Sequence, residues 1–231
     1  HVADVFHSVA SKYDLMNDLM SGGVHRMWKN KMMKEIDFSG PVKVIDLAGG
    51  TGDIAFRIAK KARAENIKYE IDVVDINQEM LDVGKERSVD LNLFSDLTFT
   101  CADGEKLPFA DESFNFFTIS FGIRNFTDIN AGLSEAYRVL KPGGKFICLE
   151  FSKVNDYFLQ KIYDTYSFKL LPKIGKIFSN DEDSYRYLAE SIRLHPDQET
   201  MKQMMVDAGF ERCDYQNMSA GIVALHSGYK F

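Results

Sequence analysis

One short stretch, residues 42–62, constrains the fold of this chain more than any other. It begins with the β-branched residues Val42, Val44 and Ile45, which favour a strand. Three glycines follow within residues 48–52, and apolar residues then recur at helical spacing. A glycine turn lets the backbone bend sharply and lets a ligand approach without meeting a Cβ, while the next helix directs free N–H groups at that ligand. The pattern predicts a nucleotide-cofactor site, and a purely structural turn is the alternative.

Predicted strands and helices alternate on both sides of this turn. Strands are expected at 42–47, 70–75, 97–101, 114–120, 145–151, near 211–217 and at 221–228, with helices at 53–65, 77–88, 128–140 and 198–208. The residues Leu140–Gly144 predict a helix stop before the fifth strand. This alternation predicts an α/β fold with a doubly wound, mostly parallel sheet of seven strands.

Two regions lie outside the alternation, and together with it they suggest four parts of a single domain. Residues 1–40 predict a helical lid or packing helices, with Tyr13 reaching inward if they form a lid. Residues 41–151 form the expected cofactor-binding core, 152–196 a helical insertion, and 197–231 the final helix and strands. The insertion is rich in aromatic residues, and residues 153–178 contain five lysines and two aspartates. It is either an ordinary helical subdomain or a wall for an apolar substrate, with a basic rim for anionic lipid.

Composition limits the classes of function that this chain can have. The 231 residues carry a net charge of −6, which gives no support to nucleic-acid binding. The three cysteines are far apart and are expected to be reduced, which favours a cytoplasmic protein. No apolar run reaches the length of a membrane span. The histidines have no ligand spacing, so no metal is expected.

Polar residues follow the predicted strands at the edge where the glycine turn lies. Asp75 stands 23 residues after Gly52 and is suited to hold both hydroxyls of a ribose. Asp103 and Gly104 follow the third strand, and Ser120 ends the fourth. Ligands bind beyond the carboxyl ends of strands in such sheets, so these groups predict one site.

Two cofactors fit this edge. Residues 50–55 satisfy the dinucleotide pattern G-x-G-x-x-G/A, with Asp75 as the acidic partner, so an NAD-dependent oxidoreductase is one alternative. Asp46, just before the turn, suits instead the cationic methionine end of S-adenosylmethionine. Resemblance to class I methyltransferases adds two features, namely Asp103-Gly104 at the adenine and the loop at residues 140–144.

Long strings of residues carry a more specific resemblance that covers nearly the whole chain. The strings are residues 6–17 (FHSVASKYDLMN), 46–53 (DLAGGTGD), 119–125 (ISFGIRN), 149–153 (LEFSK), 163–175 (YDTYSFKLLPKIG), 180–197 (NDEDSYRYLAESIRLHPD) and 221–231 (GIVALHSGYKF). In these strings the chain resembles the bacterial ubiquinone/menaquinone biosynthesis C-methyltransferase family, which has the class I methyltransferase fold. It shares the family's departure from the general pattern at Ala48, where glycine is usual. Where the family can have Asn-Ala, this chain has Asp103-Gly104.

The resemblance implies a cofactor and the residues that hold it. The family's cofactor residues fall on Thr51, Asp75, Asp103, Gly104 and Ser120. Together with the residues around the turn, the full set expected at S-adenosylmethionine is Asp46, Gly50, Thr51, Gly52, Asp75, Ile76, Asp103, Gly104, Ser120 and Tyr13.

The implied reaction moves a methyl group to a ring carbon of a polyprenylated benzoquinol (2-polyprenyl-6-methoxy-1,4-benzoquinol), of demethylmenaquinol, or of both. Carbon is a poor nucleophile unless the ring is electron-rich, so the reduced quinol is the expected acceptor. Loss of a phenolic proton would raise the electron density of the ring, which requires a base or a positioned water.

Candidates for this chemistry follow strands 4 and 5. The resemblance suggests that Arg124 helps to deprotonate the quinol through a water. A guanidinium stays protonated, so the chemistry of arginine favours a role for Arg124 as the cation that stabilises a phenolate. The alternative is that Arg124 forms a structural salt bridge. Asn125 lies beside it, and Glu150 is either a base or an anchoring group. Tyr166, Tyr185 and His195 are the expected substrate-binding residues.

A non-catalytic methyltransferase-like scaffold of a quinone-synthesis assembly is the remaining alternative, although the acidic and glycine residues of the site are intact. The lysine-rich insertion also predicts peripheral contact with the inner face of a membrane. The expected protein partners are a second copy of the chain or other quinone-biosynthesis proteins.

Overall fold

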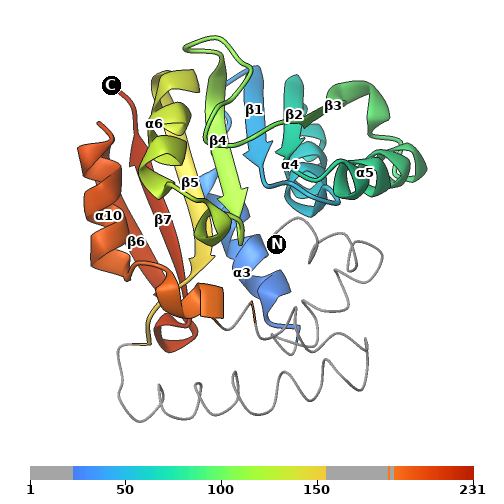
Figure 1. Cartoon of the computed structure of the whole chain (residues 1–231). Coiled ribbons are helices and arrows are strands. Elements are labelled where there is room, and N and C mark those ends of the chain that lie inside the picture. Colours follow the sequence, from blue (N-terminus) through green and yellow to red (C-terminus); the bar gives the residue numbers. More distant parts are fainter. Residues whose placement is uncertain (1–22, 155–186, 188–189) are drawn as a thin grey trace, which may run out of the picture.

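The computed structural model describes residues 23–154, 187 and 190–231. Their strands form a single sheet in the order β3-β2-β1-β4-β5-β7-β6 (Figure 1). The strands are β1 (Val42–Leu47), β2 (Tyr69–Asp75), β3 (Leu97–Cys101), β4 (Phe114–Ser120), β5 (Leu140–Phe151), β6 (Glu211–Met218) and β7 (Val223–Tyr229). The first five pair in parallel, and β7 pairs antiparallel with both β5 and β6. The prediction of a doubly wound, mostly parallel sheet is confirmed.

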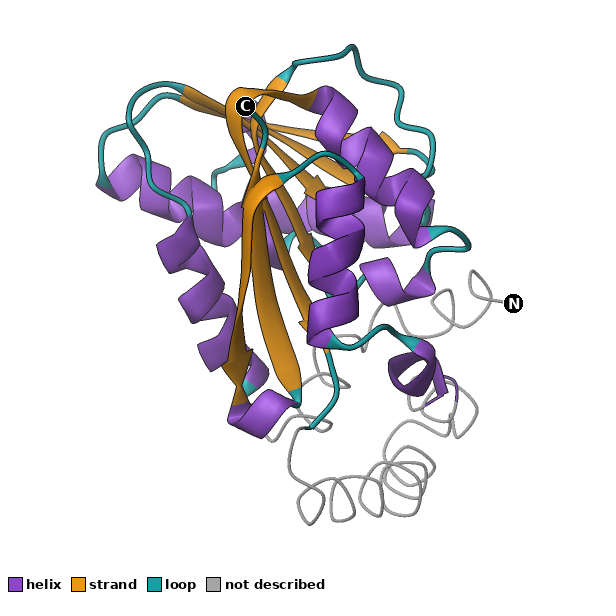
Figure 2. Cartoon of the chain, turned by 90° about the vertical axis from the view of Figure 1, so that its left-hand side faces the viewer, coloured by secondary structure: helices purple, strands orange, loops and turns teal. Residues whose placement is uncertain are grey.

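Helices cover both faces of the sheet, as Figure 2 shows. They are α3 (His25–Met32), α4 (Asp53–Ala64), α5 (Gln78–Asp90), α6 (Ile129–Val139) and α10 (Gln198–Asp207). One core cluster joins the sheet to α3, α4 and α5, and a second joins it to α6 and α10. Both faces of the central strands are therefore buried, which explains why β4 is nearly all apolar.

Side-chain caps fix where several helices begin. The side chain of Asn77 accepts hydrogen bonds from the N–H groups of Glu79 and Met80 at the start of α5. Asp128 and Asp197 cap α6 and α10 in the same way. Such caps satisfy N–H groups that a helix leaves without partners, so the local sequence sets these boundaries.

The segment predicted as a helix stop and loop, Leu140–Gly144, is instead the first part of β5. Leu140 is fully buried and pairs with Phe114, and the register with β4 shifts just after this pair. Gly143 has φ +80° and donates its N–H to the carbonyl of Lys230 at 2.6 Å. Helix α6 ends at Val139, so the predicted helix stop is confirmed. The predicted loop was wrong, because contacts with residues distant in sequence hold this glycine turn within the ladder.

Helix α3 and the 3₁₀ turn η2 (Met33–Glu35) lie within residues 1–40, which were predicted to be helical. Trp28 packs on the rings of Phe121 and Phe151, and its Nε1 donates to Ser219 Oγ at 2.9 Å. These contacts place α3 over the carboxyl ends of β4 and β5. Residues 1–22 of the predicted lid, with Tyr13, and most of the predicted insertion lie outside the described residues.

Candidate functional site

A cavity of about 280 Å³ opens at the carboxyl ends of the central strands. Eight of the residues predicted for the cofactor line it, namely Asp46, Gly50, Thr51, Asp75, Ile76, Asp103, Gly104 and Ser120. Gly52 is not among the lining residues but is the N-cap of α4, with φ +86°. Tyr13 lies outside the described residues. The structure thus gathers the predicted groups from four strand ends into one hollow.

Close packing beneath the turn requires a glycine at position 49. A Cβ at Gly49 would stand 2.6 Å from Val73 Cγ1 and 2.9 Å from the carbonyl oxygen of Asp46, so a larger residue would force one of these groups to move. The N–H of Gly52 donates to the carbonyl of Gly49 at 2.8 Å and closes the turn. Ala48 holds φ +52°, a conformation that costs about 1 kcal/mol for a residue with a side chain.

Asp75 is held by the backbone at both of its carboxylate oxygens. Oδ2 accepts from the N–H of Gly50 and Oδ1 from that of Asn77, each at 2.9 Å. Burial raises the pKa of Asp75, and these N–H groups oppose that rise. Since a carboxylate oxygen accepts two hydrogen bonds, both oxygens keep capacity for a pair of ligand hydroxyls.

Asp46 is the most deeply buried acid of the cavity wall, at 1% exposure. Its carboxylate accepts from Thr118 Oγ1 at 2.8 Å and from the N–H of Ala55 at 3.1 Å. Burial nevertheless raises its pKa to about 7. A cation brought into the cavity would stabilise the ionised form of this group.

Other features of the cavity fit a nucleoside cofactor. Ser120 Oγ is buried and has no hydrogen-bond partner within the described part of the chain. A Cβ at Gly104 would stand 2.6 Å from Phe126 Cζ, so glycine lets the ring of Phe126 pack closely against the loop after β3. Ile76 is 64% exposed at the rim and offers an apolar surface to a flat ring. An apolar rim, an acid for a diol and an unpartnered hydroxyl together suit an adenosine.

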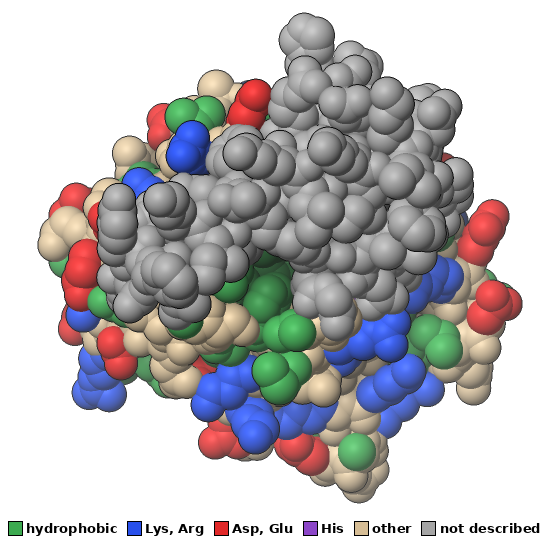
Figure 3. Space-filling view, turned by 90° about the horizontal axis from the view of Figure 1, so that it is seen from below, with side chains coloured by type: hydrophobic (Ala, Val, Ile, Leu, Met, Phe, Trp, Pro, Cys, Tyr) green, Lys and Arg blue, Asp and Glu red, His purple; other side chains and the backbone are tan. Residues whose placement is uncertain are grey.

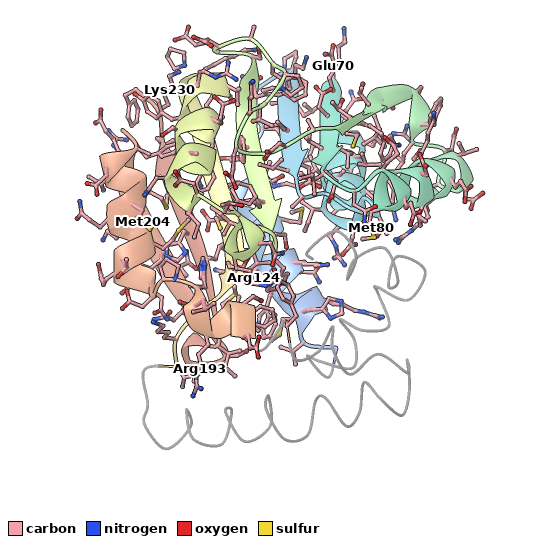
Figure 4. The ribbon with its side chains drawn as sticks, viewed as in Figure 1. Glu70, Met80, Arg124, Arg193, Met204 and Lys230 are labelled. Atoms are coloured by element: carbon pink, nitrogen blue, oxygen red, sulfur yellow. The ribbon has the colours of Figure 1, made fainter. Side chains whose placement is uncertain are left out.

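Arg124 and Glu150 form a buried ion pair next to the cavity. Arg124 Nη1 lies 2.8 Å from Glu150 Oε1, and also donates to the carbonyl of Phe121. Glu150 accepts in addition from the N–H of Phe151. Arg124 Nε is buried without a partner among the residues that the structure describes. Figure 4 shows Arg124 at the same end of the sheet as Met80, which lines the cavity.

Two described residues, Tyr187 and His195, belong to the predicted insertion, and neither is among the described residues that line the cavity. Tyr187 donates its hydroxyl to Asn125 Oδ1 at 3.2 Å, and Asn125 lines the cavity. His195 is buried, and burial lowers its pKa, so its imidazole is neutral near pH 7. Tyr187 was not predicted, because one tyrosine among many in an aromatic segment carries no distinguishing signal. Tyr166 and Tyr185 lie outside the described residues.

Sequence reasoning also missed Lys29, which lines the cavity from α3. Its Nζ lies 2.8 Å from Asp53 Oδ2, and only 7% of its side chain is exposed. A lysine on a short amphipathic helix is usually solvated, so the sequence alone gave no reason to place it in a site.

The profile of the ubiE/COQ5 methyltransferase family matches residues 1–230. The chain belongs to this family. A ubiquinone/menaquinone biosynthesis C-methyltransferase UbiE from Rickettsia bellii (strain OSU 85-389) is 54% identical over 229 residues, covering 99% of this chain and 92% of that protein. The protein of the same name from Shewanella oneidensis (strain MR-1) is 54% identical over 230 residues, covering 100% and 90%.

Solved structures of other methyltransferases share the fold of this family member. A possible histamine N-methyltransferase from Thermotoga maritima superposes with a TM-score of 0.68 at 19% identity, covering both chains completely. Phosphoethanolamine N-methyltransferase 2 from Haemonchus contortus, in complex with S-adenosylhomocysteine, gives 0.69 at 14% identity over 100% of this chain and 60% of that one.

Family and fold together settle the class of the enzyme. This member of the ubiE/COQ5 family is an S-adenosylmethionine-dependent C-methyltransferase, and the oxidoreductase and scaffold alternatives are not favoured. Across residues 23–154 and 190–231, no three metal-ligating side chains gather as a metal site would require. No helix in the described ranges has the length and apolar character needed to cross a membrane.

Proposed function

We propose that this enzyme methylates a ring carbon of a polyprenylated quinol, either 2-polyprenyl-6-methoxy-1,4-benzoquinol or demethylmenaquinol. The observation that carries the proposal is the 54% identity, over 99% of the chain, to a protein named for C-methylation in ubiquinone and menaquinone biosynthesis. The cavity supports it because its walls suit a nucleoside and Arg124 lies beside it.

We assign the nucleoside of the cofactor to the end of the cavity formed by β2 and β3. Asp75 takes the ribose hydroxyls, since its oxygens are already oriented by two N–H groups. Asp103, Gly104 and Ile76 flank the adenine, and the hydroxyl of Ser120 supplies an unpartnered polar group. When bound, S-adenosylmethionine supplies a methyl group on a sulfonium that departs as a thioether.

Arg124 supplies the positive charge for the acceptor. Its guanidinium is fixed by Glu150 and by the carbonyl of Phe121, so it stabilises a phenolate without first reorganising. Glu150 anchors this cation, because its Oε1 is already bonded to Arg124 and to the N–H of Phe151. Asn125 and Tyr187 join the loop after β4 to the insertion. His195, with Tyr166 and Tyr185, belongs to the acceptor side.

Methylation of the ring requires the quinol to give up protons. The phenolic proton leaves to a water or a neutral base, which makes the ring electron-rich. The carbon–carbon bond then forms as the sulfur–carbon bond breaks. The attacked ring carbon loses its proton and the phenolate oxygen takes one up, so the whole reaction releases one proton. The enzyme's contribution is alignment and charge, since the methyl donor is already activated.

The experiment is methyl transfer from labelled S-adenosylmethionine to a short-tailed demethyl quinone, with and without dithionite. Label is expected in the ring only when dithionite keeps the acceptor reduced. Transfer to the oxidised quinone would contradict the quinol mechanism. If the enzyme binds the cofactor but transfers no methyl group, the quinol is not its acceptor and the proposal is wrong.

We further propose that residues 1–40 act as a lid, that 152–196 form the acceptor wall, and that the enzyme makes peripheral contact with the inner face of a membrane. Met27 on α3 and Leu194 are apolar and 62% and 86% exposed. Helix α3 and Arg193, the neighbour of Leu194 in the chain, lie at the lower end of the sheet in Figures 1 and 4. Figure 3 shows apolar and basic side chains together at this end. Co-sedimentation with anionic vesicles is expected, and its absence would contradict the contact.

A further inference from the structure

Lys29 is a lysine almost completely removed from solvent on the wall of the cofactor cavity. It lies on α3, is 5% exposed and lines the cavity together with Asp53. A buried ammonium is unfavourable unless it is paired, and its one hydrogen bond in the described structure goes to Asp53 Oδ2 at 2.8 Å. An ammonium has three donors, so this pairing leaves Lys29 with donors for a second anion.

The charges of the cavity are strongly unequal. Among the described residues that line it, Lys29 is the only lysine or arginine. The acidic lining residues are Asp46, Asp53, Asp75, Asp103 and Glu105. An anionic group that enters the cavity therefore finds one side chain of opposite charge, whereas a cationic group finds several.

Lys29 lies on the side of the cavity away from the proposed nucleoside position. The acids after β2 and β3 lie toward one edge of the sheet, in the order β3-β2-β1-β4-β5. The neighbouring Trp28 packs on Phe121 and Phe151, beyond β4 and β5. A cofactor whose adenosine lies at β2 and β3 thus directs its amino-acid end toward α3.

We propose that the ammonium of Lys29 binds the α-carboxylate of the methionine end of S-adenosylmethionine. This inference rests on the cofactor placement proposed above and adds a specificity residue to it. Asp46 and Asp53 then face the ammonium of the same amino acid, so both charged groups of the ligand meet opposite charges. The site thereby distinguishes a complete amino acid from a simple amine.

The surroundings of Lys29 hold it in position before the ligand arrives. Asp53 is fixed by a second cation, since Arg57 Nε lies 3.0 Å from its Oδ1. Arg57 in turn donates to Asn30 Oδ1 at 2.6 Å, on the same helix as Lys29. These contacts tie α3 to the first turn of α4. Preorganisation of this kind reduces the entropy lost when a ligand binds.

The competing role for Lys29 is purely structural, as the link between α3 and Asp53. The two roles differ in the ratio of affinities for a ligand with the carboxylate and a ligand without it. A structural role predicts that loss of Lys29 weakens all ligands of the cavity equally, whereas a carboxylate-binding role predicts loss of affinity only for ligands with that carboxylate.

The test is calorimetric binding of S-adenosylmethionine and decarboxylated S-adenosylmethionine, without quinol, to the full chain. The two ligands differ only in the carboxylate. Wild type is expected to prefer the complete ligand by about 10- to 100-fold, the range of one charge-assisted hydrogen bond. Lys29→Met is expected to reduce this preference to about 1- to 3-fold, and Lys29→Arg to retain most of it. Lys34→Met, on an exposed lysine that does not line the cavity, is the matched control and should leave the ratio unchanged.

Each outcome bears on the proposal. Equal weakening of both ligands by Lys29→Met, or no preference in wild type, would overturn it. If Lys29→Met fails to fold, the double variant Lys29→Met with Asp53→Asn removes both charges of the pair and measures the same ratio. Wild type that binds neither ligand would instead contradict the cofactor placement itself, which separates the failure of the two proposals.

Discussion

The guanidinium of Arg124 and the carboxylate of Glu150 form an ion pair that is almost completely shielded from water. Nη1 and Oε1 are 2.8 Å apart, and the two side chains are 5% and 1% exposed. The pair joins the 3₁₀ turn η4 (Ile123–Asn125), which follows β4, to the last residues of β5. It therefore fixes a cation at the edge of the sheet where the cofactor cavity opens.

Breaking this pair is expected to lower stability and turnover together, but in different proportions. Arg124→Met leaves a buried carboxylate uncompensated, which costs about 3–5 kcal/mol of unfolding free energy. We expect kcat to fall by about 100-fold or more, while the Kd of S-adenosylmethionine changes only a few-fold. Denaturant unfolding and calorimetry check these values. The double variant Arg124→Met with Glu150→Gln should lose less stability than the two single changes combined.

Glu150→Gln separates the anchoring role from that of a base. If Glu150 is an anchor, the Glu150→Gln variant should keep measurable turnover, because Arg124 keeps its charge and its hydrogen bond to the carbonyl of Phe121. Complete loss of methyl transfer in a folded Glu150→Gln protein that still binds cofactor would identify Glu150 as the base instead. Methyl-transfer rates measured across pH 6–9 make the distinction.

Asp75→Asn is expected to lower the affinity for S-adenosylmethionine by about 10- to 100-fold. The unfolding free energy should fall by no more than ~1–2 kcal/mol. The amide has a single acceptor oxygen, so the N–H of either Gly50 or Asn77 loses its hydrogen-bond partner. The ribose hydroxyls also lose a negatively charged acceptor. Asp90→Asn, at an exposed position on α5, is the control. Equal affinities of the Asp75 variant and wild type in calorimetry would exclude Asp75 from the ribose site.

The buried carboxyl of Asp46 predicts a pH dependence of both stability and binding. Burial raises its pKa to about 7 from the ordinary 3.8. The folded chain thus holds this proton more tightly than the unfolded chain, so the stability contribution is complete below pH ~4 and is lost as pH rises through about 7. A cationic ligand favours the ionised form, so the affinity for S-adenosylmethionine should increase from pH 6 to pH 8.

Asp46→Asn should remove that pH dependence. The unfolding free energy of the variant, relative to wild type, should increase by ~2–4 kcal/mol between pH 4 and pH 8. Calorimetry below pH 7 in two buffers of different ionisation enthalpy should detect proton release in wild type only. A pH-independent difference between the two proteins would show that Asp46 is ionised throughout this range.

Ala48 and Gly122 form a matched pair beneath the cavity. A Cβ at Gly122 would stand 2.3 Å from the Cβ of Ala48, so Gly122→Ala should cost about 1–3 kcal/mol of unfolding free energy. Ala48→Gly should add up to ~1 kcal/mol, because Ala48 holds φ +52°. The double variant is expected to recover most of the stability lost by Gly122→Ala. Strictly additive effects in denaturant titrations would contradict the pairing.

The local sequence determined the order of the elements and one side of the cofactor cavity. Alternating β-branched residues, the glycines after β1 and the cap at Asn77 act through the backbone within a few residues. Asp75 could be placed for the same reason, since the end of a parallel strand next to a glycine turn is a position that chain order already defines.

Only the tertiary structure decided the rest. Leu140–Gly144 ends helix α6 as its local pattern predicts, yet it joins β5 in place of a loop because Phe114 and Lys230 supply partners distant in the chain. Lys29 enters the cavity because packing of Trp28 sets the position of α3, and Arg124 pairs with Glu150 across 26 residues of sequence. Burial and charge pairing depend on the three-dimensional neighbours of a side chain, and no pattern of local spacing encodes them.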